Sequence, residues 1–197
     1  MPKGIPLTSE EQSKRRLEIV GIAMNIFKEK GFQGTGMREI AKAVGVGKSS
    51  LYESFKTKDE ILVFALEDEM LQIIDQTQSI AGSDFPPDVR IKQMMQMYLN
   101  FIQTNNTLLL WLNAEAQGLS VESQHRLQEK RYAYQDIVRS IIEEGISKGF
   151  FRKVDALVTA RLLINSMITV LYTSRPTGSA EEMLNEVIEI VFNGIKM

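Results

Sequence analysis

The sequence lacks cysteine and contains a single histidine, His125, among its 197 residues. The absence of cysteine excludes a disulfide framework, a cysteine-ligated zinc or iron–sulfur site and a thiol nucleophile. A single histidine also excludes metal sites that need several histidines and most histidine-based proton relays. We therefore expect no catalytic residue, no metal site, no cofactor and no enzyme activity.

Long apolar runs are also missing. The N-terminal residues 1–12 have no apolar core of the kind that forms a signal peptide. The most apolar stretch, residues 156–172, is interrupted by Arg161 and Asn165 and is shorter than the ~20 residues of a membrane span. This stretch is more typical of a buried helix, and we expect a cytoplasmic protein with no membrane partner.

The charge is unevenly distributed along the chain. Residues 1–60 carry 11 Lys and Arg against 8 Asp and Glu, whereas residues 61–197 carry 12 against 17. A mildly basic N-terminal part on an acidic remainder suggests that a polyanion would bind at the N-terminal end.

Strand signals are nearly absent, whereas helical periodicity with capping residues recurs along the chain. We expect an all-α protein of about nine helices. The first is capped by a Ser9–Gln12 capping box and closed by Gly31 in the left-handed conformation, and a second capping box joins Thr57 and Glu60. The other expected helices cover 37–44, 48–55, 58–80, 88–104, 107–117, 121–148, a stretch from the Asp155 cap to about residue 174, and one from residue 179 or 180 to about residue 193.

The segment 37–55 carries the most specific signal. Two short helices can pack at a steep angle when the first presents a small residue, here Ala41, and when the connecting turn accepts a positive φ, here at Gly45. Leu51 follows ten residues after Ala41, which is the spacing of a helix-turn-helix that reads DNA. The sequence therefore predicts a DNA-binding unit in the N-terminal part.

At these positions the sequence resembles the TetR family of bacterial transcriptional regulators over about residues 16–64. The residues that carry the resemblance are Gly31-Phe32, Thr35, Arg38-Glu39-Ile40-Ala41, Gly45-Val46, Leu51-Tyr52, Phe55, Thr57-Lys58-Asp59-Glu60 and Leu62. The resemblance implies a three-helix DNA-binding domain over residues 1–57 and a ligand-binding and dimerisation domain over residues 58–197. It also implies a homodimer that binds double-stranded operator DNA and a small-molecule effector.

The DNA contacts of the family carry over by position. Thr35 and Arg38 would hold phosphates, and Lys58 would bind a phosphate at the start of the fourth helix. The residues expected to face the major groove or its backbone are Lys48, Ser49, Ser50 and Tyr52. Lys48 is the best candidate for guanine recognition. Each of Tyr52, Lys58 and Arg38 also has a purely structural interpretation, in the core of the unit or in a local ion pair.

Two features depart from the family pattern. Gly47 replaces the usual Ser or Thr that caps the recognition helix, so the side-chain hydrogen bond of the cap is lost. Glu53 stands where an aromatic residue or histidine is common, and a carboxylate is unfavourable near phosphates unless it accepts from a cytosine amino group. Two further patterns are weak: residues 45–50 resemble only part of a phosphate-binding loop, and Glu122 and His125 form half of a di-iron motif.

The helix expected after Asp155 is apolar on nearly every side, so it needs covering from two directions. We expect that it forms a four-helix dimer interface with the last helix and their symmetry mates, although it could also be the central helix of a monomer. The residues assigned to this interface are Leu157, Ile164, Ile168, Leu171, Leu184, Val187, Ile188 and Val191.

Methionine and aromatic residues are concentrated in two neighbouring helices, which is typical of adaptable ligand pockets but also of an ordinary core. The candidate pocket residues are Met94, Met97, Tyr98, Phe101, Trp111, Asn113 and Asn165. The sequence as a whole predicts a DNA-binding transcriptional regulator, a repressor that a small molecule releases from its operator. The alternatives are an architectural DNA-binding protein without an effector and a helical-bundle enzyme.

Overall fold

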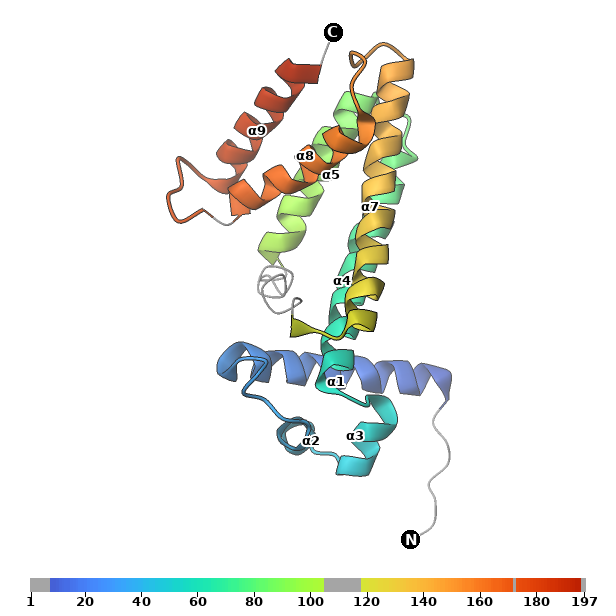
Figure 1. Cartoon of the computed structure of the whole chain (residues 1–197), viewed down its shortest axis with the longest axis vertical. Coiled ribbons are helices and arrows are strands. Elements are labelled where there is room, and N and C mark those ends of the chain that lie inside the picture. The colour runs from blue at the N-terminus through green and yellow to red at the C-terminus, as the bar shows by residue number, and fades with distance from the viewer. Residues whose placement is uncertain (1–7, 105–117, 172, 196–197) are drawn as a thin grey trace. The chain divides into compact units, whose positions relative to one another are not determined.

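The computed structural model describes residues 8–104, 118–171 and 173–195. Within these residues the regular structure is helical and no β-strand forms (Figure 1), so the all-α prediction is confirmed. The helices are α1 (Ser9–Lys30), α2 (Met37–Val44), α3 (Lys48–Ser54), α4 (Lys58–Ala81), α5 (Pro87–Thr104), α7 (Val121–Ser147), α8 (Ala156–Leu171) and α9 (Ala180–Ile195). The helix expected over 107–117 lies outside the described residues.

The first helix begins with a capping box that differs from the predicted one. Thr8, and not Ser9, is the N-cap: its hydroxyl accepts from the Glu11 N–H at 3.3 Å, and the Glu11 carboxylate accepts from the Thr8 N–H at 2.8 Å. The Ser9–Gln12 prediction is therefore wrong by one residue. A carboxylate accepts more strongly than an amide and also interacts favourably with the helix N-terminus, which favours Glu11 over Gln12 as the partner.

Of three other predicted caps, one agrees with the structure and two differ from it in detail. Asp155 accepts from the Val158 N–H at 2.9 Å, as expected. Thr57 accepts from the Glu60 N–H at 3.1 Å, but the Glu60 carboxylate accepts from the Lys56 N–H at 2.6 Å, so the second capping box closes one residue earlier than predicted. Gly31 has a φ of 80° with a ψ of 149°, which is a positive φ but not the left-handed helical conformation expected there.

The described chain forms two compact units. Unit 1 contains residues 8–68 and 118–127, and unit 2 contains residues 69–104, 128–171 and 173–195. Helices α4 and α7 each contribute residues to both units. The domain boundary expected at residue 57 differs from the limit of unit 1 at residue 68, and it stays a prediction about function.

Unit 1 contains the helix-turn-helix formed by α2 and α3. Ala41 is 4% exposed and lies in the interior of the unit, as the spacing predicted. Gly45 has a φ of 74° and a ψ of 27°, so it occupies the left-handed conformation that residues with a Cβ adopt only at a cost. The N–H groups of Gly45 and Val46 donate to the carbonyls of Lys42 and Ala41, which closes α2 and directs the chain into α3.

Unit 2 is built around a core to which α5, α8 and α9 contribute, and α8 packs against both of the other two. Its largest fully buried side chains include Phe151 and Phe192, whose ring centroids lie 6.1 Å apart. Gly145 of α7 lets Phe151 approach closely, because a Cβ at Gly145 would lie 2.2 Å from the Phe151 ring. These contacts fix the end of α7 against the start of the segment that leads into α8.

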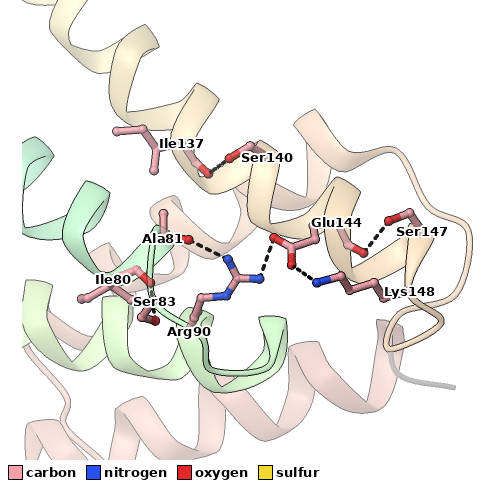
Figure 2. Close-up of polar contacts among 9 residues, drawn as sticks. All are labelled: Ile80, Ala81, Ser83, Arg90, Ile137, Ser140, Glu144, Ser147 and Lys148. Carbon is pink, nitrogen blue, oxygen red and sulfur yellow. Dashed lines mark hydrogen bonds and ion pairs between the residues drawn. The ribbon is translucent and has the colours of Figure 1, made fainter.

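A buried arginine connects three segments of unit 2 (Figure 2). The Arg90 side chain is 5% exposed; its guanidinium donates to the Ala81 carbonyl at 2.6 Å and pairs with the Glu144 carboxylate at 2.6 Å. Lys148 pairs with the same carboxylate at 2.7 Å. The end of α4, the first turns of α5 and the last turns of α7 are therefore joined by a charged cluster, which we call the Arg90 cluster (Ala81, Arg90, Glu144 and Lys148).

The hydrogen bonds from Arg90 and Lys148 hold the pKa of Glu144 below its ordinary value. A carboxyl whose pKa is depressed by folding stabilises the protein above its unfolded pKa of about 4.3 and loses that contribution as the pH falls through the folded pKa. The Arg90 cluster should therefore stabilise unit 2 at neutral pH and lose this effect in acid.

We expect Glu144→Gln to lower the melting temperature at pH 7 by roughly 2–12 °C, because it leaves the buried Arg90 without its counter-charge. Glu144 itself is 32% exposed, which keeps the effect below that of a fully buried pair. The difference in melting temperature between the two proteins should shrink progressively as the pH falls below the unfolded pKa of about 4.3, because the contribution of Glu144 is lost as the pH approaches and passes its lower folded pKa.

Thermal melts from pH 3 to pH 8 measure this difference, and Glu143→Gln is the matched control. Glu143 is 57% exposed and pairs with Arg139 at 3.3 Å on the surface of α7, so its replacement should change the melting temperature little. A Glu144→Gln protein that melts like wild type at pH 7, or a difference that is constant with pH, would contradict this account of the Arg90 cluster.

Candidate nucleic-acid interface

Helix α3 turns Leu51 inward and several polar side chains outward. Leu51 is fully buried, whereas Lys48 and Ser49 are exposed and Tyr52 is half-buried. The Lys48 ammonium lies 5.6 Å from the centre of the Tyr52 ring, so these two side chains are neighbours on one side of the helix. We call Lys48, Ser49 and Tyr52 the outer surface of α3. The N-cap is Gly47 and makes no side-chain hydrogen bond, as its residue type predicted.

Ser50, which was also expected to face DNA, is held by α1. Its hydroxyl is half-buried and accepts from the Arg15 guanidinium at 3.1 Å. The first turn of α3 is therefore tied to α1 through a side chain that the sequence analysis assigned to DNA.

Thr35 and Arg38, the two residues expected to hold phosphates near the start of α2, differ in exposure. Arg38 is exposed, and the structural alternative of a pair with Glu39 does not form, because Glu39 pairs with Lys30. Thr35 is 2% exposed and its hydroxyl donates to the Gly31 carbonyl at 2.9 Å. Arg38 thus presents its charge to solvent, whereas the Thr35 hydroxyl is used inside unit 1.

Lys58 begins α4 and contacts the loop between α1 and α2. Its ammonium donates to the carbonyls of Phe32 at 2.8 Å and Gln33 at 3.3 Å, and lies 4.5 Å from the centre of the Phe32 ring. An ammonium has three N–H donors, so one remains for a phosphate. The structural alternative for Lys58, a local ion pair with Glu60, does not form, and the ammonium contacts these carbonyls instead.

Arg16 is a functional candidate that the sequence analysis missed. Its guanidinium carbon lies 4.6 Å from the ring centres of both Phe55 and Phe64, and these rings meet edge-on at 5.7 Å. Phe55 ends α3 and Phe64 belongs to α4, so Arg16 of α1 holds the end of α3 against α4. The three residues are far apart in the sequence, and no local pattern indicates that they meet.

A second missed contact joins α4 to the first turns of α7 within unit 1. The Arg126 guanidinium makes a two-pronged contact with the Glu67 carboxylate, with Nε 3.0 Å from one oxygen and the terminal nitrogen on the other. Such forked pairs restrict orientation more than single contacts do. Together with Lys58 and Arg16, this pair fixes α4 within unit 1.

The candidate pocket residues fall into three groups. Met94 and Phe101 are buried in the core of unit 2, and Met97 and Tyr98 are half-buried beside it. Asn165 is exposed on α8, so it does not line the interior. Trp111 and Asn113 lie outside the described residues.

A tyrosine that was not predicted joins this group. The Tyr134 ring stacks on Tyr98 with a centroid distance of 6.2 Å, and burial raises the pKa of its hydroxyl. The interior of unit 2 therefore combines methionine, phenylalanine and stacked tyrosine side chains.

The candidate dimer residues differ in their exposure. Leu184 and Ile188 are 0% and 4% exposed and pack inside unit 2, and the side chain of Ile168 lies outside what is described. The half-buried ones are Leu157, Ile164, Leu171, Val187 and Val191. The apolar side chains that α8 and α9 expose most were missed: Val158 at 50%, Leu162 at 61% and Ile190 at 64%. Helical periodicity shows that α8 is apolar all round but not which of its sides the chain itself covers.

No described helix is long and apolar enough to cross a membrane. Within the part of the chain that the structure describes, no three metal-ligating side chains gather into a possible metal site.

Known protein families and relatives match this chain over most of its length. A model described as bacterial regulatory proteins of the tetR family matches residues 19–63, and a model described as the C-terminal domain of tetracyclin repressor-like proteins matches residues 84–195. The transcriptional repressor KstR2 of Mycolicibacterium smegmatis is 25% identical over 200 residues, which cover 96% of this chain and 95% of that protein.

Two solved structures share the fold. The regulator FadR of Bacillus subtilis in complex with stearoyl-CoA has a TM-score of 0.78 at 19% identity and covers 90% of this chain and 98% of its own. The regulator AibR in complex with isovaleryl coenzyme A and operator DNA has a TM-score of 0.70 at 20% identity, with the same shares of the two chains covered. With its helix-turn-helix and these matches to both halves, the chain belongs to the TetR family of bacterial regulatory proteins.

Proposed function

We propose that this transcriptional regulator is a homodimeric repressor that binds operator DNA through α3 and leaves it when an acyl-coenzyme A binds to unit 2. The observation that carries the DNA-binding part is the outer surface of α3, where Lys48 and Ser49 are exposed and Tyr52 is half-buried, whereas Leu51 is fully buried. We expect this activity in the bacterial cytoplasm, where chromosomal DNA lies, and it requires no catalytic step.

The DNA contacts follow from the chemistry of these side chains. Lys48 carries a charge that fits the O6 and N7 acceptors of guanine in the major groove. Ser49, Tyr52, Arg38 and the free N–H of Lys58 suit phosphate oxygens, which set the register of a protein on its site. The Ser50 and Thr35 hydroxyls already make hydrogen bonds with Arg15 and Gly31 inside unit 1. These two residues would therefore support DNA binding by fixing the backbone and not by contacting phosphates.

A homodimer would place two copies of α3 on a palindromic site. Its interface would involve the sides of α8 and α9 that expose Val158, Leu162 and Ile190, flanked by the half-buried Leu157, Ile164, Leu171, Val187 and Val191. Large apolar side chains that are half or more exposed on adjacent helices favour a protein partner over solvent. Under this proposal residues 1–57 bind DNA, and residues 58–197 hold the effector and the partner.

The effector class is supported by two relatives whose structures contain acyl-coenzyme A thioesters. The methionine and aromatic residues in the interior of unit 2, among them Met94, Phe101 and Tyr134, suit the apolar acyl chain of such a ligand. A ligand can release DNA only by its differential affinity for two shapes of the protein. Helix α4 has residues in both units and is anchored in unit 1 by Lys58, Arg16 and Glu67, so a displacement of α4 would also displace α3.

The test measures the affinity for DNA with and without acyl-coenzyme A. A DNA ligand is first selected from a random double-stranded library, and fluorescence anisotropy then gives its Kd with stearoyl-CoA, isovaleryl-CoA or free coenzyme A added. At least one thioester should raise the Kd by roughly 5–150-fold, the usual range of coupling between two sites, and free coenzyme A should not.

Thermal melts with the same compounds distinguish two failures. A thioester that raises the melting temperature but leaves the Kd unchanged binds without releasing DNA, which contradicts the proposed mechanism. If neither quantity changes with either thioester, the proposed effector class is wrong, and the protein is better described as a DNA-binding protein without this kind of effector.

A further inference from the structure

Glu53 lies at the centre of the exposed side of α3. A helix turns by about 100° per residue, so positions two before and two after Leu51 lie almost diametrically opposite it. These positions are Ser49 and Glu53, and both are exposed whereas Leu51 is fully buried. If α3 enters the major groove, the Glu53 carboxylate is therefore among the groups that point most directly at the bases.

The Glu53 carboxylate also makes no hydrogen bond or ion pair with any residue that the structure describes. Two other carboxylates of unit 1 are engaged: Glu39 pairs with Lys30, and Glu67 accepts two N–H groups from Arg126. Nothing in the described protein neutralises Glu53 or turns it away from the outer surface of α3.

A free carboxylate at this place is unfavourable for DNA binding in general, because phosphates repel it. It is favourable only where the groove offers a hydrogen-bond donor. In the major groove guanine presents two acceptors and thymine an acceptor and a methyl group, so only the amino groups of cytosine and adenine can donate to Glu53. Adenine places its N7 acceptor beside its amino group, where it repels a carboxylate, whereas the cytosine edge has no such acceptor.

We propose that Glu53 is a specificity-determining residue that accepts a hydrogen bond from the N4 amino group of one cytosine in each half of the operator. The proposal rests on the proposed DNA-binding role of α3 and adds a base and a residue to it. It assigns Glu53 a double effect: the carboxylate favours one base at one position, and it weakens binding to all other DNA.

Two substitutions give different and specific expectations. Glu53→Gln replaces the carboxylate with an amide that both donates and accepts, and an amide pairs with the N6 and N7 of adenine. The preferred base should therefore change from cytosine to adenine at that position. Glu53→Ala removes the acceptor and should leave no preference there, with discrimination reduced by a factor of roughly 5–150 in each half-site.

The experiment selects binding sites from a random double-stranded library with wild type, both variants and Glu18→Gln. Glu18 is exposed on α1, so its replacement makes the same change of charge on a different helix. Because Glu53 is exposed, we expect both variants to fold, and thermal melts verify this. Glu18→Gln should enrich the wild-type motif, and both Glu53 variants should also bind unrelated DNA more tightly than Glu18→Gln does.

The outcomes separate this inference from the proposed function. Enrichment of one motif by wild type, with a change of base confined to one position of each half-site in the Glu53 variants, supports the inference. Enrichment of the same motif with the same base frequencies by wild type and both Glu53 variants overturns it and leaves operator binding intact. If wild type enriches no motif at all, operator binding fails and the inference fails with it.

Discussion

Leu162→Glu is expected to convert the protein into a monomer and to weaken its binding to operator DNA by about 100-fold or more. Leu162 is 61% exposed on α8, so the substitution does not disturb the core of unit 2. In the proposed dimer, however, this leucine becomes buried against the partner, where an unpaired carboxylate is strongly unfavourable. The loss of affinity follows because two linked copies of α3 bind a palindrome far more tightly than one copy does.

Sedimentation velocity measures the mass of the protein, and anisotropy measures its affinity for the selected DNA. Leu71→Glu is the matched control, since Leu71 is also an exposed leucine, 43% exposed, but lies on α4. The control should keep the mass and the affinity of wild type. A Leu162→Glu protein that sediments as a dimer would remove this side of α8 from the proposed interface.

Lys48→Ala is expected to raise the Kd for the selected operator by roughly 25-fold to more than 1,000-fold. The estimate takes about 1–3 kcal/mol of base discrimination for each half-site and counts two half-sites in a dimer. In the selected motif, the preference for guanine should be lost at one position of each half-site, and the other positions should keep their preferences. Binding to unrelated DNA should weaken much less, because only one positive charge per protomer is removed.

The control for Lys48 is Lys28→Ala, which removes an exposed lysine from the end of α1. It should lower the affinity for all DNA slightly and leave the motif unchanged. A Lys48→Ala protein that binds the operator as tightly as wild type would mean that α3 does not contact bases as proposed.

The helices were predictable because each is specified by local chemistry. The bounds of α2 agree with the prediction at both ends, since Gly45 supplies the positive φ that ends the helix and the residues before it have the right periodicity. The start of α1 was predicted one residue too late, because two hydroxyls and two possible partners compete there. Local sequence does not show that Glu11 accepts more strongly than Gln12.

The parts of the site that depend on long-range contacts were not predictable. The sequence offered Lys48 and Tyr52 as candidates, but it did not indicate that Arg16 contacts both Phe55 and Phe64 or that Arg126 holds Glu67. Nor did it separate Leu184, which packs inside unit 2, from Leu162, which is exposed. Both are leucines in apolar helices, and only the packing of α5, α8 and α9 decides which one the chain covers.

The contacts that hold α3 in place and the side chains it presents outward come from different positions of the helix. Leu51, Ser50 and Phe55 anchor it, through the core, Arg15 and Arg16 respectively, whereas Ser49 and Glu53 take no part in anchoring. Under the proposed DNA-binding role of α3, substitutions at the outward positions redirect the protein to another promoter while its architecture is preserved. This division gives natural selection a way to rewire a regulatory circuit through one or two codons, without first rebuilding the scaffold that carries them.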